Sequence, residues 1–312
     1  MHAYDRAEAA LARELPGRTP AWWQAWIDIQ MSRIELYYYL SQIHEMTERV
    51  AQTQPVVQQY GLPAQRAGFL RSLILASLWR DFTAGRHERY MTSEESLGYA
   101  QALLATRLEM GNEREVGWAR FYLAIACLWH GDLEEAEEQL QAALTLGERT
   151  GDVTLQARCL GNLIHVYRNR GQVEATRSAS LRALALVTET PMPYYIGMAK
   201  ANLAWVAWRE RNLAEAWELG RAALELWSQS SIFMPVRWTA LWPLIGTELA
   251  QERIPEAMAD ARMLLAPGQQ LPPEALSAVV EGVLQEWNTG QREIARKNLD
   301  QATVMAQLMG YL

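Results

Sequence analysis

Along the middle of the chain, apolar residues recur at helical spacing and are interrupted by a glycine every twenty residues. These glycines are Gly111, Gly131, Gly151 and Gly171, and the residue after each is polar: Asn112, Asp132, Asp152 and Gln172. Glycine just past a helix end adopts the left-handed conformation at little cost, and Asn or Asp beside it can cap the next helix. Each interval therefore predicts one helix of about 16–18 residues followed by a tight turn.

Alternate intervals differ in character, so the predicted repeat is a helix pair of about forty residues. The aromatic residues concentrate in the first helices, as in residues 118–122, 195–208 and 238–249. The second helices carry small residues at helical spacing, which allow neighbouring helices to approach closely. Five of them open on an acidic or neutral residue followed by alanine, at Glu135-Ala136, Glu174-Ala175, Glu215-Ala216, Glu256-Ala257 and, more loosely, Ile294-Ala295.

The pattern predicts an all-α fold of seven antiparallel helix pairs in a single solenoid domain over residues 1–312. Residues 1–19 are expected to form a capping helix or the remnant of an upstream repeat. The sequence contains no sustained alternation and no Asn-Gly or Asp-Gly hairpin turn. Pro235 and Pro255 fit a first helical turn, whereas Pro243 is expected to kink its helix or end it early. The first helices are expected to begin near Pro20, Pro63, Asn112, Asp152, Pro191, Ile232 and Pro272.

Composition argues against several classes of protein. The chain has 312 residues, of which 50% are hydrophobic, and carries a net charge of −7 without a basic block, so it is neither disordered nor a typical nucleic-acid binder. The longest apolar run, residues 121–129, is too short to span a bilayer, which needs about 20 residues. Residues 1–14 lack the pattern of a signal peptide, and Cys127 and Cys159 read as buried, reduced thiols. We therefore expect a cytoplasmic protein with no nucleic-acid or membrane partner.

The helix pairs resemble the tetratricopeptide repeat, a module of stacked helix hairpins. The resemblance rests on residues 131–136, followed by Leu140 and Ala143, and on Leu160-Gly161, Gly171 and Glu174-Ala175. The repeat here is longer than the usual length of about 34 residues. The resemblance implies a right-handed superhelix whose first helices line a concave groove, where partner peptides lie.

Three shorter stretches resemble the C-terminal repeat regions of large bacterial signal-transduction ATPases, transcriptional activators and cyclases. They are residues 204–209, residues 264–270 and the sequence Gly310-Tyr311-Leu312. That resemblance implies a regulatory role as a sensor or docking region. Nucleotide hydrolysis and gene control do not carry over, because this chain has no ATPase or output module.

Equivalent positions of successive first helices place Asn162 and Asn202 in one column. These amides either hydrogen-bond between helices or form a ladder that holds a peptide backbone, since an amide offers both a donor and an acceptor. The cations Arg158 and Lys200 lie nearby, followed by Arg168 and Arg209 nearer the helix ends. They form either a solvated face with ion pairs or a site that captures a carboxylate or an acidic peptide.

Trp205 and Trp242 either belong to the core between repeats or line the groove as a surface for a ligand. His165, one turn from Asn162, is expected to hydrogen-bond in the core or groove rather than to catalyse. The five histidines are scattered, and no phosphate loop or nucleophile motif occurs, so the sequence predicts no catalytic residue, no metal site and no cofactor.

These patterns together predict a non-catalytic scaffold for protein interaction or sensing. Its expected partner is a peptide or a protein domain, including an upstream module of its own parent chain, bound in the concave groove. The alternative is a small-molecule sensing domain, because the aromatic rings can pack against sugars and apolar ligands.

Overall fold

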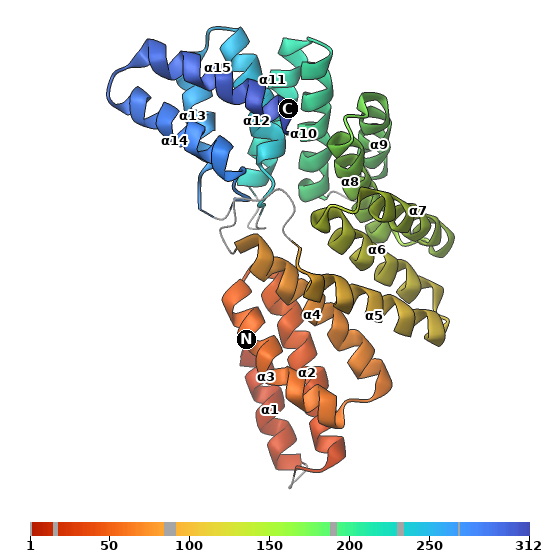
Figure 1. Cartoon of the computed structure of the whole chain (residues 1–312). Coiled ribbons are helices and arrows are strands. Elements are labelled where there is room, and N and C mark those ends of the chain that lie inside the picture. Colours follow the sequence, from red (N-terminus) through yellow and green to blue (C-terminus); the bar gives the residue numbers. More distant parts are fainter. Residues whose placement is uncertain (1, 15–17, 84–91, 188–191, 230–233, 268) are drawn as a thin grey trace.

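The computed structural model describes residues 2–14, 18–83, 92–187, 192–229, 234–267 and 269–312, which form fifteen helices and no strand (Figure 1). The helices are α1 His2–Glu14, α2 Pro20–Tyr39, α3 Ile43–Tyr60, α4 Pro63–Thr83, α5 Glu94–Met110, α6 Glu113–His130, α7 Leu133–Thr150, α8 Val153–Asn169, α9 Val173–Leu186, α10 Pro193–Arg209, α11 Leu213–Ser228, α12 Trp238–Ala250, α13 Ile254–Leu264, α14 Glu274–Asn288 and α15 Arg292–Leu308.

The all-helical solenoid of seven pairs is confirmed. The first helices are α2, α4, α6, α8, α10, α12 and α14, and α1 packs on α2. Two of the expected starting points, Pro191 and Ile232, lie outside the described residues. In Figure 1 the pairs follow one another from α1 at one end to α15 at the other.

The predicted glycine turns are present. Gly111, Gly131, Gly151 and Gly171 all have positive φ, between 67° and 107°. The expected side-chain caps form in two of the four places: Asn112 Oδ1 accepts from the Glu115 amide at 3.2 Å, and Asp152 Oδ1 from the Leu155 amide at 3.0 Å. Asp132 and Gln172 begin their helices without such a bond.

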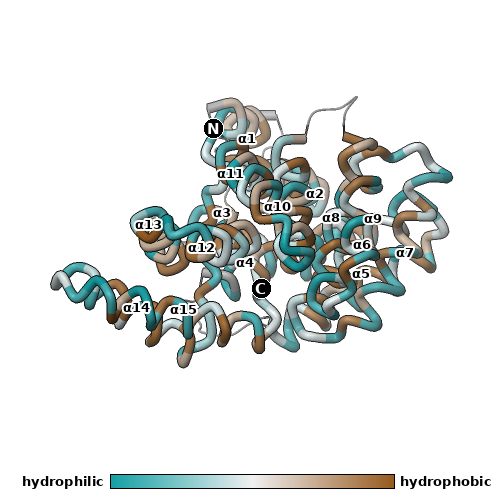
Figure 2. Tube along the Cα trace, turned by 90° about the horizontal axis from the view of Figure 1, so that it is seen from above, coloured by the Kyte–Doolittle hydropathy of each residue, from teal (hydrophilic) through white to brown (hydrophobic). Residues whose placement is uncertain are grey.

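Neighbouring first helices contact one another from α2 through α12, so they form the inner layer of the solenoid. At the end of the array the contacts change, because α12 packs on α15. In Figure 2 the C-terminal end of the chain lies near the middle of the molecule, whereas α7 and α13 lie on the rim. Helices approach very closely where small residues meet large ones: a Cβ atom at Gly197 of α10 would lie 2.2 Å from Nε1 of Trp227 in α11.

Pro243 was expected either to kink its helix or to end it early, and the second alternative does not occur, because Pro243 lies inside α12. A proline lacks the amide that would donate to the carbonyl four residues before, here Thr239 O. The guanidinium of Arg168, from α8, donates to that oxygen at 2.8 Å. Pro235 precedes α12, whereas Pro255 lies in the first turn of α13 as expected.

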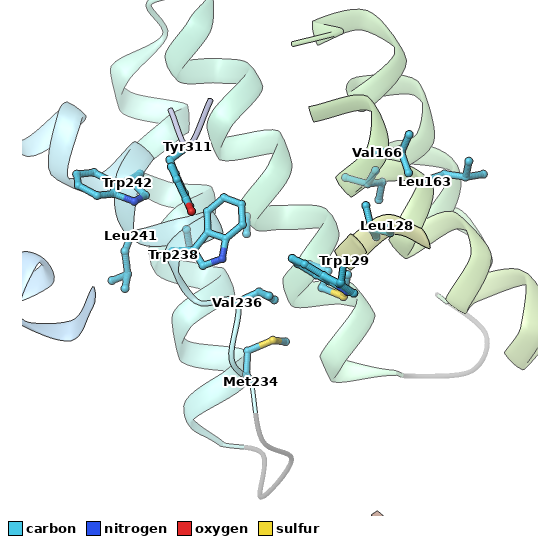
Figure 3. Close-up of a cluster of buried hydrophobic side chains, with 14 of the residues drawn as sticks. Leu128, Trp129, Leu163, Val166, Met234, Val236, Trp238, Leu241, Trp242 and Tyr311 are labelled. Carbon is cyan, nitrogen blue, oxygen red and sulfur yellow. The ribbon is translucent and has the colours of Figure 1, made fainter. Parts of the chain in front are cut away.

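Arg168 also joins the end of the chain to the inner layer. Its guanidinium donates to Tyr311 O at 2.8 Å and to Asn202 Oδ1 at 3.1 Å, and it lies over the rings of Trp205 and Trp238. The Tyr311 and Trp238 rings meet edge to face with centroids 4.9 Å apart. Figure 3 shows these two side chains next to each other. The sequence suggested that Arg168 lies either on a solvated face or in a site open to a carboxylate. Neither is the case, because Arg168 is only 1% exposed.

A second buried charge group joins α11, α12 and α13. The guanidinium of Arg221 pairs with Asp260 at 2.8 Å and with Glu248, and Trp217 Nε1 donates to Glu248 at 3.2 Å. Burial, with the neighbouring charge of Glu248, raises the pKa of Asp260 to about 7. Removal from water and a nearby negative charge both disfavour the ionised form of the Asp260 carboxyl group.

Candidate ligand-binding site

A cavity of about 330 Å³ lies on the inner layer, where the first helices of five pairs meet the segment before α12. We call it the apolar cavity, because most of its lining is aromatic or aliphatic. The lining residues are Tyr38, Tyr39, Ser41, Leu75, Leu78, Trp79, Phe121, Tyr122, Ile125, Trp129, Arg158, Asn162, His165, Met192, Pro193, Tyr194, Tyr195, Met198, Pro235 and Val236.

The helical repeat explains why these side chains converge. On α6 the lining residues are Phe121, Tyr122, Ile125 and Trp129, which share one face at spacings of about one turn. On α8 they lie at positions 158, 162 and 165, again on one face. Because first helices pack side by side, each contributes that face to the same surface. Figure 3 shows Trp129 and Val236, from widely separated repeats, in one cluster of buried side chains.

Three titratable groups that line the apolar cavity, His165, Tyr194 and Tyr195, are uncharged at neutral pH. Burial, together with the charge of Arg168, lowers the pKa of His165 to about 3, so its imidazole is neutral. Burial raises the pKa of the hydroxyls of Tyr194 and Tyr195 well above the usual value, so both keep their protons. The neutral hydroxyls can donate hydrogen bonds to a ligand.

A second cavity, of about 530 Å³, adjoins the first and shares Tyr38, Tyr39, Leu75, Tyr122 and Arg158 with it. We call it the polar cavity, because it is lined by four acidic residues and four arginines. Three of these arginines are already paired within the protein. The pairs are Arg71–Glu35 at 2.5 Å, Arg107–Glu115 at 3.1 Å and Arg114–Asp152 at 2.9 Å.

Three of the residues singled out in the sequence, Arg158, Asn162 and His165, line the apolar cavity. Asn162 Nδ2 donates to the Arg158 carbonyl of its own helix at 2.9 Å, which leaves its side-chain oxygen available to a ligand. His165 is 2% exposed and lies beside Trp129, with ring centroids 5.9 Å apart. These residues come from three successive turns of α8.

The other five candidates do not line either cavity. Asn202 is 0% exposed: its Oδ1 accepts from Arg168 of α8, and its Nδ2 donates to Met198 O of its own helix. Asn162 and Asn202 therefore do not form a ladder open to a peptide. Trp205 and Trp242 are also fully buried, because α10 and α12 turn these rings into the contact between repeats. Lys200 is half-buried, and Arg209 is exposed with its guanidinium over Trp205.

Sequence reasoning missed the tyrosines that form much of the cavity wall. Tyr38 and Tyr39 lie at the end of α2, and Tyr194 and Tyr195 lie at the start of α10. The runs of adjacent tyrosines at helix ends were a usable signal. Their convergence depends on the curvature of the inner layer, which brings the first pair close to the fifth.

The described residues contain no group of three or more His, Cys, Asp or Glu side chains placed to hold a metal ion. Burial raises the pKa of the Cys127 thiol to about 12, so this thiol is not a ready nucleophile. Within the same part of the chain, no helix is long and apolar enough to cross a membrane.

No protein-family model matches this chain, and no curated protein matches it in sequence. Solved structures do match its fold. The crystal structure of the apo form of RapI has a TM-score of 0.58 and 13% identity, covering 98% of this chain and 82% of that chain. A Rap protein complexed with competence and sporulation factor has a TM-score of 0.65 and 11% identity, and the match covers 99% of this chain and 83% of that chain. The chain therefore shares the helical-repeat fold of the Rap proteins.

Proposed function

We propose that this chain is a non-catalytic scaffold that binds a peptide or a partner domain in the apolar and polar cavities. The observation that supports the proposal most strongly is the apolar cavity itself. Aromatic side chains from five repeats surround it, and such concave sites bind ligands by excluding water around a few oriented polar groups. One Rap protein of the same fold was solved in complex with competence and sporulation factor.

The proposal also includes a regulatory role and a place in the cell. The resemblance of residues 204–209 and 264–270 to bacterial signalling proteins supports a regulatory module that works in the cytoplasm. In that setting the partner is a signalling peptide or another module of the parent chain. The volume of the apolar cavity, about 330 Å³, also supports a second candidate, the sensing of a small molecule, because sites for small ligands begin at about 300 Å³.

The test fills the apolar cavity. Ile125 lines it and is half-buried, so Ile125→Trp adds a ring to the space that a ligand would occupy. Val304→Trp, on the exposed face of α15, is the matched control, since Val304 is 56% exposed and lies in neither cavity. The wild-type protein is mixed with a soluble library of random heptapeptides, and the peptides that it retains are identified by mass spectrometry. The binding of these selected peptides is then compared between the wild type and each variant.

We expect Ile125→Trp to weaken the binding of selected peptides by about tenfold or more, with Val304→Trp unchanged. Circular dichroism checks that both variants fold. Equal binding by both variants would place the peptides elsewhere and refute the proposed site. Hits from a metabolite library alone, equally sensitive to Ile125→Trp, would favour the small-molecule alternative.

A further inference from the structure

Arg158 differs from the other arginines that line the cavities. Arg71, Arg107 and Arg114 each pair with a carboxylate of the protein. Arg158 forms no ion pair and no side-chain hydrogen bond with any described residue, and its buried Nε lacks an acceptor. The Arg158 side chain is half-buried, and its Nε is shielded from water without an acceptor. A shielded donor of this kind is stabilised when a ligand supplies the missing acceptor. A ligand is therefore expected to complete the surroundings of Arg158.

The guanidinium is held in place without using its hydrogen-bonding groups. Its Cζ atom lies 5.3 Å from the centroid of Trp118 and 6.0 Å from that of Phe121. The ring faces stabilise the cation and limit the directions in which the side chain can turn. The N–H groups remain for a planar acceptor, and a carboxylate matches a guanidinium with two parallel hydrogen bonds.

Arg158 also marks the boundary between two environments, because it lines both cavities. On one side, the apolar cavity of about 330 Å³ is lined by aromatic rings and carries no other charge. On the other side, the polar cavity of about 530 Å³ is lined by charged groups that are mostly paired. A ligand that spans both must be apolar at one end and polar over the rest, with its anionic group where the two cavities meet.

We propose that the occupant is a short peptide whose free C-terminal carboxylate pairs with Arg158, while its last apolar side chain enters the apolar cavity. The preceding residues then lie in the polar cavity. Only a C-terminal residue carries a carboxylate and an apolar side chain on the same Cα atom, which suits a cation at the mouth of an apolar cavity. A neutral or cationic group at this position would leave Arg158 unpaired or repel it.

This inference rests on the proposed function, and its test separates the two. Heptapeptides with free C-termini that are selected on the full chain are resynthesised as C-terminal amides. This change removes the charge from the ligand and leaves the protein intact. Both forms are titrated against the wild type, Arg158→Gln and Arg114→Gln. Arg114 is the matched control, because it lines the polar cavity but is paired with Asp152.

We expect the amide to bind the wild type about tenfold or more weakly than the free acid. Arg158→Gln should weaken the free acid to a similar extent and remove the difference between acid and amide. Arg114→Gln should preserve the difference. Equal binding of acid and amide to the wild type would overturn this inference and leave the proposed function standing.

Two further results would also overturn the inference. Peptides that depend on Arg158 but tolerate the C-terminal amide would exclude the terminal carboxylate, because an acidic side chain of the peptide would then supply the anion. A preference for the free acid that survives Arg158→Gln would assign the anion to another residue. If no peptide is retained by the full chain, the proposed peptide function fails, and this inference fails with it.

Discussion

Arg168 and Pro243 are expected to be energetically coupled, although they lie 75 positions apart. Pro243 deprives Thr239 O of its helical amide donor, and Arg168 donates to that oxygen from α8 at 2.8 Å. Pro243→Ala restores an N–H group that can donate to Thr239 O within α12. The loss of Arg168 should therefore be less harmful when residue 243 is alanine.

The structure allows the size of the effect to be worked out. Arg168→Met removes hydrogen bonds to Thr239 O, Tyr311 O and Asn202 Oδ1. Leaving a buried acceptor without its donor costs about 1–3 kcal/mol of stability. Part of the total cost is offset, because Arg168→Met also removes a charge that the folded protein would otherwise have to bury. We expect Arg168→Met to lower the free energy of unfolding by about 3 kcal/mol. In the Pro243→Ala background the loss should be about 1–2 kcal/mol smaller.

The assay is a double-mutant cycle in urea, followed by circular dichroism at 222 nm. Arg209→Met is the control, because Arg209 also lies over Trp205 but is exposed, so its change should stay within about 0.5 kcal/mol. Equal losses from Arg168→Met in the two backgrounds would refute the reasoning, since Thr239 O would then not depend on Arg168.

Two further predictions concern packing and pH. Gly197→Ala should destabilise the chain by about 1–3 kcal/mol, because the new Cβ overlaps Trp227. Gly282→Ala, at a helical position with open space around it, should stabilise the chain by up to about 1 kcal/mol. If urea unfolding shows that both substitutions change the free energy of unfolding in the same direction, the reasoning is contradicted. The raised pKa of Asp260, about 7 against an ordinary 3.8, means that the native state holds a proton that the unfolded state releases. The stabilisation from this group should be lost as pH rises from about 4 to 7 and should stay constant above pH 7. Asp260→Asn should remove this decline in urea unfolding measured across that range, and an unchanged decline would exclude Asp260 as its source.

The candidate site could be predicted only in part. The spacing of Arg158, Asn162 and His165 along one helix identified a face that lines the apolar cavity. The same spacing put Asn202 in an equivalent position, yet it is buried against Arg168. Equivalent positions in a repeat have the same place on their own helix, but the neighbours that cover them differ from one pair to the next.

The sequence by itself determined the helix pairs, because glycine at a left-handed turn and apolar residues at helical spacing are local requirements. The periods of twenty and forty residues predicted the seven pairs, and the positive φ of Gly111 and its equivalents agrees with them. Tertiary structure alone decided which surfaces meet. The curvature of the inner layer brings Tyr38 near Tyr195, and it buries Arg168 while leaving Arg158 without an ion pair among the described residues. Curvature is the sum of small rotations over many contacts, so no short stretch of sequence encodes it.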